Sequence, residues 1–130
     1  MGVFSSIFES NKGENNKENF NWNLLIETSQ LKEITELSHS KLVVIFKHST
    51  RCGISSSVLS KFEKATDSNL ETVAFYFLDL LKYRNISNEI AETFNVYHQS
   101  PQAIFLKNGV VVKQASHYDI ISHLSLDDLM

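Results

Sequence analysis

The sequence is poor in residues that impose covalent or backbone constraints, since its 130 residues include one cysteine, one proline and four glycines. A single cysteine excludes an internal disulfide, the usual staple of small secreted domains. The formal net charge is -3, so no excess of basic residues favours nucleic acid. The longest apolar run, LVVIF, is too short to span a bilayer. We therefore expect no nucleic-acid partner, no membrane association, a monomer and a cytoplasmic location.

Composition changes once along the chain. The segment SNKGENNKEN, residues 10–19, is polar and cannot bury enough apolar surface to offset the entropy of ordering it. We expect residues 1–19 to form a flexible leader and residues 20–130 to form one domain. With 42% hydrophobic residues, a chain of this length can build a single core.

Strand and helix patterns alternate through the expected domain. Apolar and β-branched runs predict strands at residues 21–27, 41–48 and 73–80, and the segment 102–114 predicts a hairpin around Asn108-Gly109. Helical spacing relates three sets of residues: Leu31, Ile34 and Leu37; Ile54, Val58, Leu59, Phe62 and Ala65; Ile90, Ala91 and Phe94. A last helix begins near Tyr118. This order predicts an α/β thioredoxin-like fold, a central mixed sheet with helices on both faces.

Cys52 lies between a predicted strand and a predicted helix, in the stretch HSTRCGIS. A lone cysteine is more often a buried apolar side chain than a reactive one. At a helix start, however, unpaired N–H groups and the helix dipole favour the thiolate, which is the nucleophile. His48 and Arg51 can add positive charge, and Arg51 can also hold a carboxylate of a small ligand. A structural His48 and a solvated Arg51 explain the sequence equally well.

Ser55 occupies the position where a C-x-x-C motif has its second cysteine. Its hydroxyl can hydrogen-bond the thiolate or simply belong to a polar helix start. Without a second cysteine, a mixed disulfide on Cys52 must be released by another thiol. The only proline, Pro101, begins the strand before the hairpin, where thioredoxin-like folds place a cis-proline. We expect a cis Ser100-Pro101 bond, with Ser100 offering backbone groups to a client segment.

FKHSTRCGIS, residues 46–55, together with SPQAIFLKNGVVV and ASHYDI, closely resembles the YtxJ-type family of monothiol bacilliredoxins. The resemblance implies that Cys52 attacks the mixed disulfide of an S-bacillithiolated client protein, takes over the low-molecular-weight thiol bacillithiol and frees the client. It implies bacillithiol as co-substrate and no tightly bound cofactor. The surrounding residues that support Cys52 on this basis are His48, Thr50, Arg51, Gly53 and Ser55. Gly53 stands where the family often has proline.

Two other functions remain open on the sequence. CGIS differs by one residue from the CGFS of monothiol glutaredoxins, which share an iron–sulfur cluster between two subunits, although their Gly-Gly-Asp segment is missing here. A non-catalytic thioredoxin-like binding module with an inert Cys52 is the other. His117, Asp119 and His123 lack the spacing of a zinc site, so we expect no protein-only metal site. The residues alone do not select bacillithiol over glutathione.

Overall fold

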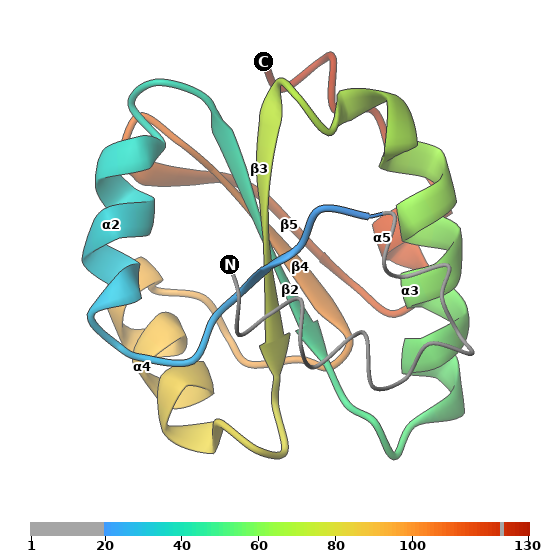
Figure 1. The fold of residues 1–130 in the computed structure, drawn as a ribbon. Helices are drawn as coiled ribbons and strands as arrows, with labels where there is room; N and C mark the ends of the chain where they lie inside the picture. Colours follow the sequence, from blue (N-terminus) through green and yellow to red (C-terminus); the bar gives the residue numbers. More distant parts are fainter. Residues whose placement is uncertain (1–19, 123) are drawn as a thin grey trace.

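The computed structural model describes residues 20–122 and 124–130, and in these ranges one five-stranded sheet forms the centre of the molecule (Figure 1). The strand order is β1-β3-β2-β4-β5, and the strands are β1 (Asn23–Leu24), β2 (Leu42–His48), β3 (Val73–Asp79), β4 (Gln102–Lys107) and β5 (Val110–Ser116). β1 and β2 run parallel to β3, whereas β4 is antiparallel to β2 and to β5. The leader expected at residues 1–19 lies outside the described residues.

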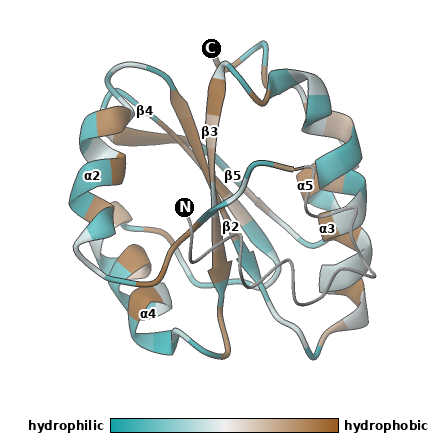
Figure 2. Ribbon diagram, in the orientation of Figure 1, coloured by the Kyte–Doolittle hydropathy of each residue, from teal (hydrophilic) through white to brown (hydrophobic). Residues whose placement is uncertain are grey.

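Helices cover both faces of this sheet (Figure 1). α2 (Gln30–Leu37) and α4 (Arg84–Phe94) lie on one side, and α3 (Gly53–Thr66) and α5 (Asp119–Ser122) lie on the other, with the short 3-10 helix η2 (Asp67–Asn69) following α3. The strands are hydrophobic along most of their length, while the helices are hydrophobic on one face (Figure 2). The protein therefore has the expected α/β thioredoxin-like architecture.

The two faces bury different side chains because successive residues of a strand point to opposite sides. The core between the sheet and the helices α3 and α5 is rich in aromatic rings, and its members include Trp22, Phe46, Phe62, Phe75 and Phe105. The core between the sheet and the helices α2 and α4 is mainly aliphatic, with Ile34, Ile45, Ile86, Ile90 and Ile104 among its members. No helix of the described ranges is long and apolar enough to cross a membrane.

Two details of the predicted elements are wrong. The first strand is two residues long rather than seven. In α3, Ile54 is 41% exposed and Ala65 is also exposed, whereas Ser55 and Thr66 are buried with Val58, Leu59 and Phe62. The helix is thus rotated from its predicted orientation, because buried hydroxyl groups with hydrogen-bond partners take the place of apolar side chains.

The hairpin between β4 and β5 forms as predicted. Asn108 and Gly109 have φ values of 53° and 81°, the left-handed conformation that a type I′ turn requires. The N–H of Asn108 donates to the carbonyl oxygen of Ser38, and the N–H of Gly109 donates to its hydroxyl, each over 2.8 Å. These bonds attach the turn to the end of α2, at the end of the sheet away from Cys52.

Candidate functional site

Cys52 is the residue that caps α3, and its side chain is partly exposed. Its backbone is extended, with φ of -111° and ψ of 119°, so the chain changes from a turn to a helix at this residue. The N–H of Cys52 donates to the carbonyl oxygen of Ser49, and the N–H of Ser56 donates to that of Cys52. The predicted strand-to-helix junction is therefore confirmed. Cys52 thus directly precedes the first helical turn, although its side chain makes no capping hydrogen bond to that turn.

Ser55 connects the end of β2 to the first turn of α3. The side chain is fully buried, and its Oγ lies 2.7 Å from Nδ1 of His48. The same oxygen accepts the N–H of Ser49 over 3.1 Å. His48 is 6% exposed, and its ring lies 5.5 Å from that of Phe77. These contacts make Ser55 and His48 a brace that holds the turn of residues 49–52, and they direct the hydroxyl to partners other than Cys52.

Three of the predicted supporting residues lie on the surface of this turn. Thr50, Arg51 and Gly53 are all exposed. In the part of the chain that the structure describes, Arg51 forms no ion pair or hydrogen bond through its side chain, so its guanidinium is available to a ligand. A Cβ at Gly53 would have no atom within 4 Å. The roles of these three residues remain predictions.

The segment before β4 comes to the same end of the sheet as Cys52. The Ser100-Pro101 peptide bond is cis, as predicted. Lys47 pairs with Gln102 in the β2–β4 register, so Pro101 follows on alongside His48, whose imidazole reaches the first turn of α3. The carbonyl oxygen of Pro101 accepts the N–H of His117 over 3.0 Å. The buried hydroxyl of Ser100 has no hydrogen-bond partner among the described residues.

A pair of basic side chains, from buried Lys47 and exposed His98, lies behind this segment on the α4 side of the sheet. Lys47 is fully buried at the end of β2, and its Nζ lies 2.7 Å from Nδ1 of His98. Ser87 Oγ lies 3.4 Å from the same nitrogen. Burial lowers the pKa of Lys47 from 10.5 to about 8. Partial desolvation of its ring also lowers the pKa of His98, with smaller contributions from the positive charges of Lys47 and Arg84.

Gln102 ties down the same segment from β4. Its side chain is fully buried, and its amide nitrogen donates to the carbonyl oxygen of Tyr97 and to Gln114 Oε1, each over 2.9 Å. Its amide oxygen accepts the N–H of Gln99. Sequence reasoning missed both Lys47 and Gln102 as parts of the site. The sequence feature that could have indicated them is a polar residue within an otherwise apolar strand, near the last residue of β2 and at the first residue of β4.

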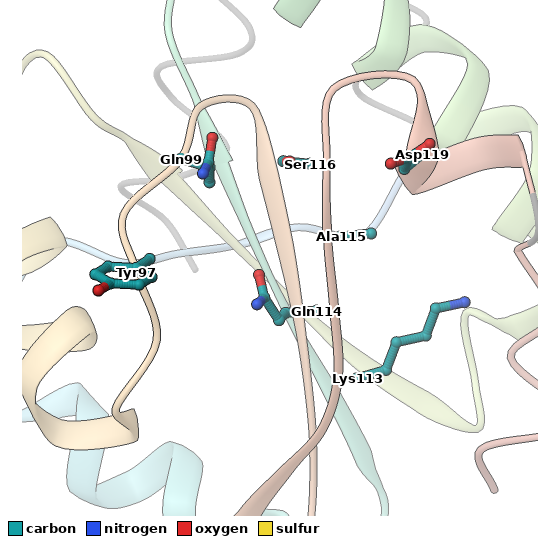
Figure 3. A pocket seen from close by; sticks show the side chains of 7 residues that line it. All are labelled: Tyr97, Gln99, Lys113, Gln114, Ala115, Ser116 and Asp119. Carbon is teal, nitrogen blue, oxygen red and sulfur yellow. The ribbon is translucent and has the colours of Figure 1, made fainter.

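A polar pocket of about 400 Å³ opens beside this segment (Figure 3). Tyr97 and Gln99 line it from the segment before β4, and the other lining residues are Lys113, Gln114, Ala115, Ser116 and Asp119. Residues 20–122 and 124–130 contain no group of three or more His, Cys, Asp or Glu side chains placed to hold a metal ion. His123 lies outside these ranges.

Comparison with known proteins agrees with the geometry of the site. The sequence model of the monothiol bacilliredoxin BrxC family matches residues 23–124. A solved structure described as a proposed oxidoreductase with a thioredoxin fold is 32% identical, with a TM-score of 0.65, over 75% of this chain and 83% of that chain. The Malassezia sympodialis thioredoxin is 26% identical, with a TM-score of 0.60, over 75% of this chain and 79% of its own.

A more distant similarity extends to the thioredoxin of Schistosoma mansoni, which shares the fold with a TM-score of 0.62 at 22% identity, over 85% of this chain and 94% of that chain. The family match includes Cys52, the turn before it and the cis-proline segment, which are the parts of the site described above. The chain therefore belongs to the monothiol bacilliredoxin family and is a thiol oxidoreductase with a thioredoxin fold.

Proposed function

We propose that the protein removes bacillithiol from S-bacillithiolated protein cysteines, with Cys52 as the nucleophile. The observation that carries the proposal is a lone, partly exposed thiol at the start of α3, with a buried serine at position 55. A dithiol protein would resolve its own mixed disulfide through that position. Here the chain has no second cysteine, so the mixed disulfide must persist until another thiol arrives.

The proposed exchange has two steps. The Cys52 thiolate attacks the bacillithiol sulfur of the client's mixed disulfide, a new S–S bond forms to Cys52, and the client leaves as a thiolate that takes a proton from solvent. A second bacillithiol then attacks the adduct as its thiolate, which releases bacillithiol disulfide and restores the Cys52 thiolate. Overall, the client sulfur is reduced and the sulfur of the incoming bacillithiol is oxidised, while the bacillithiol taken from the client stays in a disulfide throughout, so electrons balance without a tightly bound cofactor.

The surroundings of Cys52 support each partner of this exchange. The exposed guanidinium of Arg51, adjacent in sequence, offers a planar fork for a carboxylate of the small thiol. Ser100 and Pro101 supply a backbone segment at the same end of the sheet, which we assign to the extended client chain. We further propose a monomer that acts in the cytoplasm, where thiols are kept reduced.

The direct test uses a synthetic peptide whose cysteine carries bacillithiol. In excess reduced bacillithiol, the natural protein should release the free peptide, and intact mass should show a bacillithiol adduct on Cys52. Cys52→Ser should abolish release, because a serine alkoxide is inaccessible at neutral pH. A glutathionylated peptide with reduced glutathione serves as the parallel substrate, and equal turnover of the two would contradict specificity for bacillithiol.

A second variant tests whether position 52 matters rather than the mere presence of a thiol. Ser60 is exposed two turns further along α3, so Cys52→Ser combined with Ser60→Cys keeps one accessible thiol on the same helix. This variant should also be inactive, because its sulfur lies outside the first helical turn. Turnover close to that of the natural protein would overturn the proposed role of Cys52.

A further inference from the structure

We propose that Lys47 and His98 form a positioning pair that fixes residues 97–101, the segment on which substrate is received beside Cys52. The inference rests on the proposed function for its substrate. Its structural basis is separate, because the pair lies on the face of the sheet opposite His48 and Ser55. Neither residue touches the sulfur in the structure, so they act through the segment.

The ammonium group of Lys47 has one hydrogen-bond partner among the described residues, His98. Its neighbours across β3 and β4 are Leu78 and Gln102, neither of which carries a charge. Among the described residues, no carboxylate forms an ion pair with Lys47, and its Nζ bonds only to His98 Nδ1. Arg84 of α4 acts electrostatically on the partner His98, and it is also positive. A buried ammonium in such a place has a high desolvation cost, so it adds little stability to the fold.

The chemistry of the pair fixes the proton on His98. An ammonium group donates and cannot accept, so Nδ1 of His98 must be the acceptor. The neutral imidazole then carries its proton on Nε2. Ser87 Oγ of α4 lies 3.4 Å from the same Nδ1, whose single lone pair accepts the shorter bond from Lys47, so Lys47 is the partner that holds the ring. Lys47 thus sets both the position and the tautomer of His98.

The pair acts on a short segment that is anchored from two strands. Gln102 on β4 holds the carbonyl of Tyr97 and the N–H of Gln99, and Lys47 on β2 holds the side chain of the residue between them. Ser100 and Pro101 follow directly. Loss of the Lys47 bond would leave the Gln102 bonds in place, so the fold would survive while the segment lost one of its restraints. Binding of substrate, rather than the reactivity of the sulfur, should then change.

Lys47→Met is the central test, since methionine keeps a long unbranched side chain and removes the charge. With the bacillithiolated peptide, KM should rise about tenfold while kcat stays within about twofold, as expected when a binding contribution is lost. Alkylation of Cys52 by iodoacetamide, a small reagent that needs no binding segment, should keep its natural rate. The urea midpoint should be unchanged or higher, because a buried charge has been removed.

Two comparisons make the result specific. Lys64→Met removes an exposed lysine of α3 and should leave KM at its natural value. His98→Asn keeps an acceptor near the place of Nδ1, so its KM should lie closer to the natural value than that of His98→Leu. In nitrogen-15 NMR spectra, His98 should be the Nε2–H tautomer in the natural protein and a mixture of tautomers in Lys47→Met.

The outcomes separate this inference from the proposed function. If the natural protein does not turn over the peptide, the proposed function fails, whatever the tautomer of His98. If the natural protein is active and Lys47→Met keeps its KM, the positioning role is wrong. A fall in the urea midpoint without a change in KM would also overturn it, because Lys47 would then serve stability alone.

Discussion

Ser55→Ala should destabilise the protein far more than a surface serine substitution does. The change deletes an oxygen that accepts the N–H of Ser49 over 3.1 Å and lies 2.7 Å from Nδ1 of His48. Ser55 is fully buried and His48 is 6% exposed, so water has little access to replace the hydroxyl. The brace between the end of β2 and the first turn of α3 would be lost.

The size of the effect follows from these contacts. A buried polar group deprived of its partner costs about 1 to 3 kcal/mol. The His48 contact is the more buried of the two, while Ser49 is only partly buried and its N–H can recover a bond to water. Alanine gains about 0.5 kcal/mol in helix propensity over serine. We therefore expect the free energy of unfolding to fall by about 2 kcal/mol, from about 2.5 kcal/mol of lost contacts less the propensity gain.

Urea unfolding followed by circular dichroism measures this change. With an m-value of about 2 kcal/mol per M, the midpoint should fall by about 1 M. Ser56→Ala is the matched control, because Ser56 is exposed on the same turn of α3, and its midpoint should stay level or rise slightly. If the two variants unfold within about 0.5 kcal/mol of each other, Ser55 is not a brace and the reasoning fails.

Three further predictions follow from the same region. Gly53→Pro should raise the free energy of unfolding, measured in urea, by about 0.4 to 1 kcal/mol. The extended backbone of Cys52 suits a residue before proline, and the N–H that proline lacks at the first helical position bonds to no carbonyl within the helix. A lower urea midpoint would contradict this prediction. Ser55→Cys should shorten the life of the bacillithiol adduct and yield an internal disulfide by intact mass, and an adduct as persistent as in the natural protein would show that position 55 is out of reach of the sulfur. The pKa of Lys47 is about 8 in the folded protein and 10.5 in the unfolded chain, so the unfolded chain binds more protons between these values. The free energy of unfolding should therefore rise by about 1 kcal/mol from pH 8 to about pH 9. Lys47→Met should abolish the rise, and an equal rise in the variant would assign it to another group.

The sequence predicted the parts of the molecule that obey local rules. Asn108-Gly109 predicted its hairpin because few residues tolerate two successive positive φ values. The apolar run of β2 predicted a central strand because both of its faces are buried. The place of Cys52 at the start of α3 followed from these elements and from the helical spacing after it. The cis bond before Pro101 followed from the fold, since proline alone rarely implies it.

The missed features in α3 and at the end of β2 depend on side-chain hydrogen bonds, which a search for apolar patterns does not register. Ile54 was wrongly predicted to face the core, because a search for apolar helix faces rejects a serine such as Ser55. Ser55 can nevertheless be buried, because its hydroxyl is hydrogen-bonded to His48 and to the N–H of Ser49. Lys47 was not singled out in the sequence, because a charged residue at a strand end is usually solvated. Its partner His98 is 51 residues away, so no local pattern could indicate the pair.

The end of β2 explains how one strand organises both halves of the proposed site. Lys47 and His48 are neighbours, so their side chains leave the sheet on opposite faces. His48 contacts Ser55 and braces the turn that carries Cys52, whereas Lys47 contacts His98 and braces the segment that carries Pro101. The turn that carries the nucleophile and the segment proposed to receive substrate are therefore both held by side chains of the same strand. Because exchange requires the attacking sulfur and the disulfide to meet in line, a common anchor limits relative movement of the two. This arrangement explains why a dipeptide of two basic residues can stand at the end of a buried strand.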